Sequence, residues 1–404
     1  LGMVVRRERE IRNFVKTPFY RVLGSFQATA KDGTPVLLDA EWKAVEGSKY
    51  FKTPYLYKEN GFKEREKAEE LIAYLKEEPP LEAKVLSKEK KKETKNPPLL
   101  YNLAELQNDC SKMFKISPDE TLKVVQELYE KKLVTYPRTD ARVLSTAVAK
   151  EIYKNINGLM RYEPMAGFAK EAMNLGSFKG IAKTRYVNDK QITDHYAIIP
   201  TGQGMGNLRG LSPLSEKVYQ VVCRRFLSIF YPAAIYQKYS LVLERKKEQF
   251  FASFKVLSEP GYLKVADVNL AKKSSIQETF SDEKEGNSAQ TDEKNAEIPK
   301  VDRTLLLQVL ADLKKNAILT IADLKVKEGE TSPPKRYTSG SMILAMENAG
   351  QLIEDEELRE QIKGSGIGTS ATRAEILKKL VNNKYLDLNK KTQILTPESL
   401  GEMV

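Results

Sequence analysis

The alternation of apolar and polar residues divides the first hundred residues into strand-like and helix-like stretches. Residues 20–28 and 36–42 have the spacing of strands and flank Asp32-Gly33, a dipeptide typical of hairpin turns. A stretch rich in Glu and Lys over 62–77 has helical spacing and ends at a pair of prolines. Residues 84–95 alternate again and pass into a lysine run, which predicts a strand leaving into a linker.

Strand spacing returns in the middle of the chain. Residues 240–244 and 251–256 lie on either side of a charged turn at 245–247. We expect these strands to join the sheet begun at 20–60, with a helical block inserted between the two parts. Residues 271–299 are mostly Ser, Glu, Lys, Asn and Asp, a composition that predicts a solvated loop or a disordered insertion.

The inserted block, residues 98–200, is predicted to be mostly helical. Ser117 is placed to cap a helix, and Glu120, three residues later, completes a capping box. Pro137 disfavours helical backbone at the residue before it. The helix must therefore end before Tyr136, which is expected on an extended segment, free to project from the surface. An apolar stripe runs through Leu122, Val125, Leu128 and Tyr129.

Residues 301–404 are predicted to be helical again and contain a faint repeat of the first helical block. A Pro-Pro-x-x-Tyr sequence opens each block, at 97–101 and at 333–337. Short strands are expected at 133–136 and 385–386, and a wing-like hairpin at 389–391. The pattern fits two winged-helix-like units, which often bind DNA, or two ordinary connections from helix to strand.

Composition narrows the class of protein. Hydrophobic residues make up 41% and charged residues 30% of the 404, as in soluble globular proteins. No apolar run is long enough to span a bilayer, and no secretion leader opens the chain, so a cytoplasmic protein is expected. Cys110 and Cys223 form no CxxC pair, which argues against a zinc site. Both ends fall in helical patterns and Leu1 is not a start methionine, so we expect both ends to be cut.

Charge and histidine content set limits on partners and chemistry. The net charge of +11 favours a polyanionic partner, although many basic proteins bind none. His195 is the single histidine, so a site that holds a metal through two histidines cannot be built from this sequence.

The segment from Leu133 to Asp140 carries the first candidate chemistry. A tyrosine placed beyond a helix end can attack phosphorus, but it is a weak nucleophile unless a cation or a base assists. Arg138 is expected on the same side as Tyr136, where a guanidinium can hold two oxygens of a phosphodiester. Asp140 can orient Arg138 or meet a partner domain. With 19 tyrosines in the chain, a packing or surface role for Tyr136 remains an alternative.

Two further segments carry candidate binding groups. The apolar triplet 197–199 predicts a buried strand that ends at Pro200, and His195 stands at its start, where it can contact a phosphate or be a structural histidine. Glycines at 364, 366 and 368 precede a predicted helix, and such a loop binds phosphate well or is only a turn. It lacks the Lys-Ser/Thr of a nucleotide P-loop.

Together and in this order, the three segments resemble type IA DNA topoisomerases, most closely the bacterial topoisomerase III branch. The matching motifs are YPRTD at Tyr136, HxAIxPT at His195 and GIGTxATRAEI at Gly366. Residues 7–14 and 126–129 also fit the family. The resemblance covers nearly the whole chain, is least clear at 20–95 and is absent at 271–299.

The resemblance implies a mixed α and β multidomain protein with the toroidal type IA core, winged-helix-like helical domains and a strand-rich arch. The implied activity is cleavage and rejoining of single-stranded DNA through a 5′-phosphotyrosine, which relaxes or decatenates DNA without ATP. The implied domains are the truncated start of a DNA-binding gate domain at 1–20, the arch at 21–97 and 201–300, the tyrosine-bearing helical domain at 98–200, and a winged-helix-like DNA-binding domain at 301–404.

Roles for single residues also follow from the resemblance. Tyr136 is the implied nucleophile, Arg138 positions the scissile phosphate and His195 contacts it. Thr372 is the leading candidate for contact with single-stranded DNA. The other implied DNA-binding residues are Gln126, Thr139, Asp140, Gly366, Gly368, Thr369 and Arg373.

The resemblance also implies a part that this sequence lacks. The family carries its magnesium ligands in an N-terminal Toprim domain with a DxDxE cluster, and no such cluster occurs here. We therefore expect no metal site within these residues, a Toprim domain of the same protein as partner, and weak binding of single-stranded DNA without relaxation of supercoils.

Three other interpretations remain. A tyrosine recombinase also forms a phosphotyrosine, at the 3′ end, but needs several Arg and His residues around the tyrosine. A single-stranded DNA-binding module could keep the torus without catalysis. A basic structural protein leaves the three motifs unexplained. Cleavage preference, the balance of relaxation and decatenation, oligomeric state and chromosomal or plasmid origin are not readable from the sequence.

Overall fold

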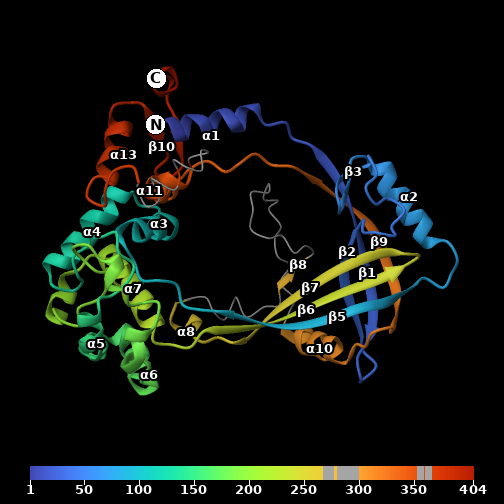
Figure 1. The fold of residues 1–404 in the computed structure, drawn as a ribbon, viewed down its shortest axis with the longest axis horizontal. Coiled ribbons are helices and arrows are strands. Elements are labelled where there is room, and N and C mark those ends of the chain that lie inside the picture. Colours follow the sequence, from blue (N-terminus) through green and yellow to red (C-terminus); the bar gives the residue numbers. More distant parts are fainter. Residues whose placement is uncertain (267–276, 280–299, 353–358, 360–365) are drawn as a thin grey trace.

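The computed structural model describes residues 1–266, 277–279, 300–352, 359 and 366–404. These residues form a ring with an open centre (Figure 1). A strand-rich arch makes one side of the ring. A helical unit lies opposite the arch, and a C-terminal unit with the first helix closes the circle.

The arch is one antiparallel sheet that curls until β2, at one end of the strand order, pairs with β1. Its path is β2-β7-β6-β5-β9-β1-β4-β3, and β1 pairs with β2 as well as with β9. The predicted insertion of the helical block is confirmed, because β2 pairs directly with β7. The strands are β1 (Pro18–Thr29), β2 (Pro35–Lys43), β3 (Leu56–Lys58), β4 (Gly61–Phe62), β5 (Glu82–Lys95), β6 (Ala234–Arg245), β7 (Glu248–Glu259), β8 (Gln277–Thr279) and β9 (Ile318–Glu330).

An aromatic core fills the inside of the curled sheet. Trp42 stacks on Phe62 with ring centroids 4.9 Å apart, and Phe26 meets Phe250 edge to face at 5.2 Å. Helices α2 (Arg65–Lys76) and α10 (Lys300–Asp312) cover the sheet with buried apolar residues, among them Leu71 and Leu310. The predicted hairpin turn is confirmed at Gly33, whose φ of 86° favours glycine.

Three expectations for the strands were wrong. The helical interpretation of 301–404 fails at β9, whose Leu319, Ile321 and Leu324 are buried in the arch core. The lysine run of β5 is no linker, because its pairing with β6 continues to Lys95. Gln277–Thr279, expected in a solvated insertion, pairs with β7. The rest of 271–299 lies outside the described residues.

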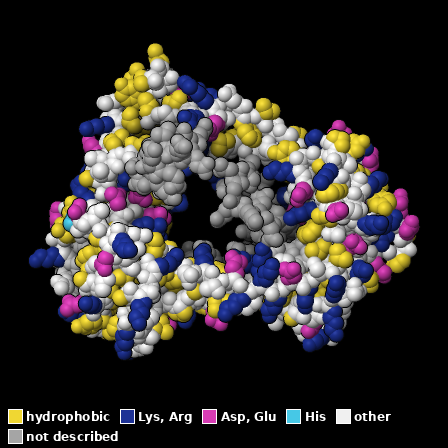
Figure 2. Space-filling model, viewed as in Figure 1, with side chains coloured by type: hydrophobic (Ala, Val, Ile, Leu, Met, Phe, Trp, Pro, Cys, Tyr) yellow, Lys and Arg dark blue, Asp and Glu magenta, His cyan; other side chains and the backbone are white. Residues whose placement is uncertain are grey.

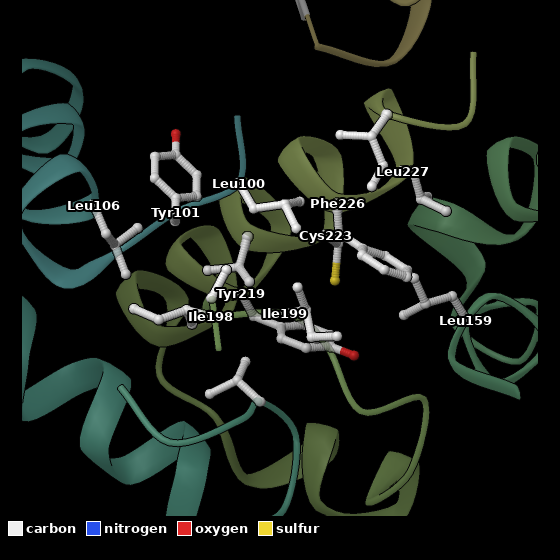
Figure 3. Close-up of a cluster of buried hydrophobic side chains, with 14 of the residues drawn as sticks. Leu100, Tyr101, Leu106, Leu159, Ile198, Ile199, Tyr219, Cys223, Phe226 and Leu227 are labelled. Carbon is white, nitrogen blue, oxygen red and sulfur yellow. The ribbon is translucent and has the colours of Figure 1, made fainter. Parts of the chain in front are cut away.

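The helical unit carries the largest buried core (Figure 3). Its end was predicted at 200, but helix α7 supplies Tyr219, Cys223 and Phe226 to the same core. Tyr262 and Val265 join that core as well, from the segment that follows β7. Its α-helices are α3 (Leu103–Phe114), α4 (Pro118–Glu130), α5 (Thr146–Leu159), α6 (Glu163–Leu175), α7 (Pro213–Ser228) and α8 (Leu263–Ala266), with 3-10 turns η1 (Ser177–Lys183), η2 (Asp189–Gln191) and η3 (Met205–Gly210).

The C-terminal unit packs against the first helix, α1 (Gly2–Asn13). The guanidinium of Arg336 donates to both carboxylate oxygens of Glu8, at 2.8 and 2.9 Å, and Val4 joins the unit's core. The predicted hairpin is confirmed as β10 (Leu386–Leu388) paired with β11 (Leu395–Pro397). The helical elements are α11 (Ser339–Glu347), η4 (Ala349–Leu352), α13 (Arg373–Asn382) and α14 (Ser399–Met403).

The ring closes where the helical unit meets the C-terminal unit, with α3 against α11. Figure 2 shows an opening through the middle, with Lys and Arg side chains among those on its rim. The chain connects these two units only through the arch, so the contact between them is non-covalent. Among the described residues, no helix is long and apolar enough to cross a membrane.

Candidate active site around Tyr136

Helix α4 positions the segment that carries Tyr136. Ser117 caps the helix as predicted, its hydroxyl accepting from the amide of Glu120 at 3.2 Å, and the helix ends at Glu130. Beyond it, Thr135 is fixed on the neighbouring chain, because its amide donates to Ile199 O and its hydroxyl to Ala197 O, both at 3.0 Å. The short strand predicted at 133–136 is an extended segment with one isolated bridge, from Val134 to Pro200.

The same contact brings Tyr136 and His195 together. Their ring centroids are 4.3 Å apart with the planes inclined by 39°. The expected strand after His195 is a buried extended segment held by isolated bridges rather than a regular strand. Tyr136 is half-buried and His195 is exposed. The two predicted residues thus form one surface site, although 58 positions separate them in the sequence printed above.

A third aromatic residue belongs to this site and was placed elsewhere by the sequence. Tyr129 was assigned to the apolar stripe of α4, but its side chain is 38% exposed and its ring meets that of Tyr136 edge to face at 5.4 Å. The other three members of the stripe are buried. Tyr129 sits at the end of the stripe, where helical spacing alone cannot separate a core position from the rim of a site.

Arg138 is the cation of the site. It lies two residues beyond Tyr136 and is half-buried. Among the described residues, its guanidinium makes no hydrogen bond or ion pair with a protein group. An unpaired guanidinium two residues from a tyrosine is suited to receive the oxygens of a phosphodiester.

Thr139 and Asp140 hold the site together. The Thr139 hydroxyl donates to His195 O at 3.1 Å and accepts from the amide of Ala141, and the residue is only 3% exposed. Asp140 does not orient Arg138, one of the two roles considered for it. Its Oδ1 instead accepts from Arg373 Nη1 of the C-terminal unit at 3.0 Å.

The glycine-rich loop lies across the ring closure from Tyr136. Gly366 rests on the end of α11, where an added Cβ would come within 2.7 Å of Glu347 O. Gly368 has a φ of 68°, which favours glycine. Gly366, Gly368, Thr369 and Thr372 are exposed, and the amide of Thr369 donates to Thr372 Oγ1 at 2.9 Å. Gly364 lies outside the described residues.

Arg373 and Gln126 are placed differently from the other predicted DNA-binding residues. The Arg373 side chain is 6% exposed, and its guanidinium donates to Ile367 O and Gly368 O as well as to Asp140. Gln126 Nε2 donates to Glu130 one turn later in α4, at 3.3 Å. In this conformation both side chains are engaged within the protein.

Two residues of the site escaped the sequence analysis. Asn102 caps α3 and also donates to Glu347 Oε2 at 3.0 Å and to Asp140 O at 3.2 Å. Burial raises the pKa of the Glu347 carboxyl, while Asn102 and Arg373 act in the opposite direction. No local pattern identifies either residue, because Asn102 and Glu347 bind each other across the contact between the two units.

The described residues do not fit a divalent metal. Among them, no group of three or more His, Cys, Asp or Glu side chains could hold an ion. Cys110 and Cys223 are buried, and burial raises the pKa of Cys110 to about 12, which keeps its thiol protonated near neutral pH. The chemistry available here is that of a tyrosine hydroxyl, an imidazole and a guanidinium.

Comparison with known proteins gives a consistent picture. A family model described as "DNA topoisomerase" matches residues 1–404. DNA topoisomerase 3 of Bacillus subtilis (strain 168) is 32% identical over 411 aligned positions, which cover 100% of this chain and 48% of that protein. DNA topoisomerase 3 of Bacillus licheniformis is 30% identical, over 98% of this chain and 48% of that protein. The chain therefore spans about half the length of the curated relatives it matches.

A solved structure shows the same fold. The full-length topoisomerase I of Thermotoga maritima superposes with a TM-score of 0.59 at 21% identity, over 99% of this chain and 52% of that one. At this level of identity the likeness concerns the architecture alone.

Proposed function

The chain belongs to the type IA DNA topoisomerase family, and from that premise we propose that Tyr136 is the nucleophile with which the protein cuts and rejoins one DNA strand. The observation that carries the proposal is the meeting of Tyr136 and His195 at one surface site, with Arg138 two residues further along the chain and without a partner among the described residues. Outside a family that uses a tyrosine, such a cluster would be weak evidence.

The proposed reaction is a transesterification in which each bond broken is matched by one formed. The hydroxyl oxygen of Tyr136 bonds to phosphorus, the bond from phosphorus to the 3′ oxygen breaks, and the 5′ phosphate stays on the tyrosine. The tyrosine gives up its proton and the departing 3′ oxygen takes one up. Rejoining is the reverse, so the bond energy is kept in the phosphotyrosine and no ATP is required.

Arg138 and His195 are proposed to act on the phosphate. The guanidinium would pair with the non-bridging oxygens, on which negative charge grows in the transition state. The imidazole of His195, beside the tyrosine ring, would contact the same phosphate. Thr139 would keep that imidazole in place by holding its backbone carbonyl.

Single-stranded DNA is proposed to bind along the exposed part of the glycine-rich loop. Thr372 and Thr369 present hydroxyls there, and Gly366 and Gly368 let a phosphate backbone approach closely. Asp140, Arg373 and Gln126 are engaged within the protein in this conformation, so their contribution to DNA binding would be indirect.

The whole protein is proposed to relax or decatenate DNA in the cytoplasm, with magnesium held by a Toprim domain of the same polypeptide. This rests on the family resemblance, which assigns the metal ligands to that domain. On the same ground, the 404 residues alone are proposed to bind single-stranded DNA without cleaving it.

Adduct formation tests the proposal. A labelled single-stranded oligonucleotide is incubated with magnesium and either this chain or the longer polypeptide that includes a Toprim domain, and covalent complexes are separated in denaturing gels. We expect an adduct only with the longer form and none with Tyr136→Phe. Tyr153→Phe, which removes a hydroxyl from an exposed tyrosine of α5, is the matched control and should leave the yield unchanged.

An adduct that survives Tyr136→Phe would contradict the assignment of the nucleophile. Binding without any adduct, in both the chain and the longer form, would instead favour a non-catalytic single-stranded DNA-binding module.

A further inference from the structure

The contact that closes the ring joins two separately folded units. The helical unit and the C-terminal unit have their own hydrophobic cores, and Ala104 of α3 is the buried residue that the helical unit gives to the other core. The buried apolar cores of the two units are therefore largely separate across this contact. Polar contacts of this kind are typical of surfaces that separate reversibly.

Small polar side chains line the centre of the contact. Ser111 of α3 and Ser339 of α11 approach with hydroxyl oxygens 3.2 Å apart, and both residues are 1% exposed. Gly340 lies so close to α3 that an added Cβ would come within 2.8 Å of the Cα of Asn108. Gln393 of the C-terminal unit crosses the same contact, because its Oε1 accepts from the Ser339 hydroxyl at 2.7 Å and its Nε2 donates to Lys115 O at 3.1 Å.

One buried guanidinium spans the contact. Arg373 Nη1 donates to Asp140 Oδ1 at 3.0 Å and lies 3.5 Å from Glu347 Oε2. Asn102 completes the set by donating to Glu347 Oε2 and to Asp140 O. We name these four residues, Asn102, Asp140, Glu347 and Arg373, the closure network. Two of them belong to each unit, so separation of the units must break it.

The closure network ties the glycine-rich loop to the segment of Tyr136. On one side, Arg373 Nε and Nη2 donate to Ile367 O and Gly368 O at 3.2 and 3.3 Å. On the other side, Asp140 lies four residues beyond Tyr136. The guanidinium thus bridges the proposed DNA-binding loop and the proposed nucleophile segment.

The charges favour a switch between two states. In the closed ring a buried cation lies between two carboxylates, of which Asp140 has a side chain 56% exposed and Glu347 one 20% exposed. Partial separation would leave the buried guanidinium of Arg373 poorly solvated and without a carboxylate. We therefore expect the two units to be either fully closed or fully apart.

We infer that Arg373 is a positioning residue that latches the ring shut, holding the glycine-rich loop in register with Tyr136 through Asp140 and Glu347. The inference deepens the proposed function, on which its meaning for DNA cleavage rests. In the closed ring each nitrogen of the buried Arg373 guanidinium has a partner within the protein, so it acts through the closure network rather than by contact with DNA.

Thiol labelling of a cysteine placed in the contact measures opening without DNA. In a Ser339→Cys background, the full chain is treated with a maleimide and the modified peptides are quantified by mass spectrometry. Asp140→Asn keeps the hydrogen bonds of Arg373 to the loop but weakens its ion pair across the contact. Labelling at position 339 should therefore become about tenfold faster, the usual effect of losing a charged hydrogen bond. Arg373→Lys should have a similar effect, and the double variant less than the product of the two.

Two controls separate opening from loss of stability. Arg336→Lys removes the two parallel hydrogen bonds to Glu8. Both residues lie on the same side of the contact between the units, so the labelling rate should be unchanged. Cys110 and Cys223, buried in the helical unit, report unfolding of that unit. Equal rates in Asp140→Asn and its parent, or a parallel rise at Cys110, would overturn the inference. Because no DNA is present, failure of Tyr136 to form an adduct would leave this result standing.

Discussion

At the scale of single residues, few side chains surround the proposed nucleophile. Tyr136 has an imidazole on one side, a second tyrosine ring on another and a guanidinium two residues away. Arg138 is the group with the most direct consequence, because no described residue neutralises it. Its charge is therefore available to a ligand.

Replacement of Arg138 should slow cleavage without unfolding the protein. In the longer polypeptide that is proposed to cleave DNA, we expect Arg138→Ala to reduce the rate of adduct formation on the order of 100-fold, the usual effect of removing one donor to a transition-state oxyanion. Arg138→Lys should be intermediate, because it keeps the charge and loses the two-pronged geometry. Single-turnover kinetics measure both. Equal rates for Arg138→Ala and the parent would show that the guanidinium does not act on the phosphate.

The sequence anticipated part of this site. The proline after Tyr136 correctly placed the tyrosine on an extended segment, since that inference needed only local backbone sterics. The meeting of Tyr136 with His195 followed only from the family resemblance. Tyr129, Asn102 and Glu347 were missed, because their roles depend on partners that no local spacing reveals.

At the scale of elements, the glycine-rich loop and helix α13 form one unit. Gly368 holds a backbone conformation with φ of 68°, and Thr372 and Ile376 lie where its side chain would extend. The loop is anchored on α11 at one end by Gly366, which rests against Glu347 O. These contacts fix the shape of the loop before any ligand arrives.

A single methyl group should disturb that shape. Gly368→Ala adds a Cβ 3.0 Å from Thr372 Oγ1 at a positive φ, and we expect a cost of about 1 kcal/mol locally. Affinity for a single-stranded oligonucleotide, measured by fluorescence anisotropy, should fall severalfold. Gly206→Ala is the matched control, because no atom lies within 4 Å of the added Cβ and the residue has no positive φ. Unchanged affinity in Gly368→Ala would contradict the proposal that single-stranded DNA binds along this loop.

Strand β9 shows why an element can escape a reading of the sequence. Its alternation of buried and exposed residues is interrupted where the register with β1 shifts, and it lies in a stretch dominated by helical spacing. It is stabilised by pairing with β1, roughly three hundred positions earlier in the chain, and with β5. Only the closed sheet defines it as a strand. The hairpin of β1 and β2 was predictable, because its turn and both partners are adjacent in sequence.

At the scale of the whole molecule, the ring is continuous through the arch and interrupted at the contact of α3 with α11. The chain leaves and re-enters the arch on either side of the helical unit, so that unit is tethered only through the arch. A torus with one non-covalent closure has a defined place at which to open. The closure network lies at that place.

Opening should respond to pH through Glu347. Burial raises the pKa of this carboxyl above its ordinary 4.5 in the closed ring, where Arg373, Asp140, Glu105 and Asn102 face it. A raised pKa means that the closed ring binds the proton of Glu347 more tightly than the open ring does. The protonated carboxyl therefore stabilises the closed ring at pH below about 4.5, and this stabilisation is lost as the pH rises through the pKa of Glu347 in the closed ring. Labelling at Ser339→Cys, corrected for the reactivity of a free thiol, should increase over that interval. Glu347→Gln should remove the dependence, and an unaltered pH profile in that variant would contradict the assignment.

The measurement that most directly tests the central claim is the identity of the DNA end that remains on the protein. Two oligonucleotides of one sequence, labelled at the 5′ or the 3′ end, are cleaved by the longer polypeptide, and the tryptic peptide that carries nucleotide is sequenced by mass spectrometry. We predict that only the 3′-labelled fragment stays attached, through its 5′ phosphate, to the peptide that contains Tyr136. Attachment of the 5′-labelled fragment, or of nucleotide to another tyrosine, would contradict the account.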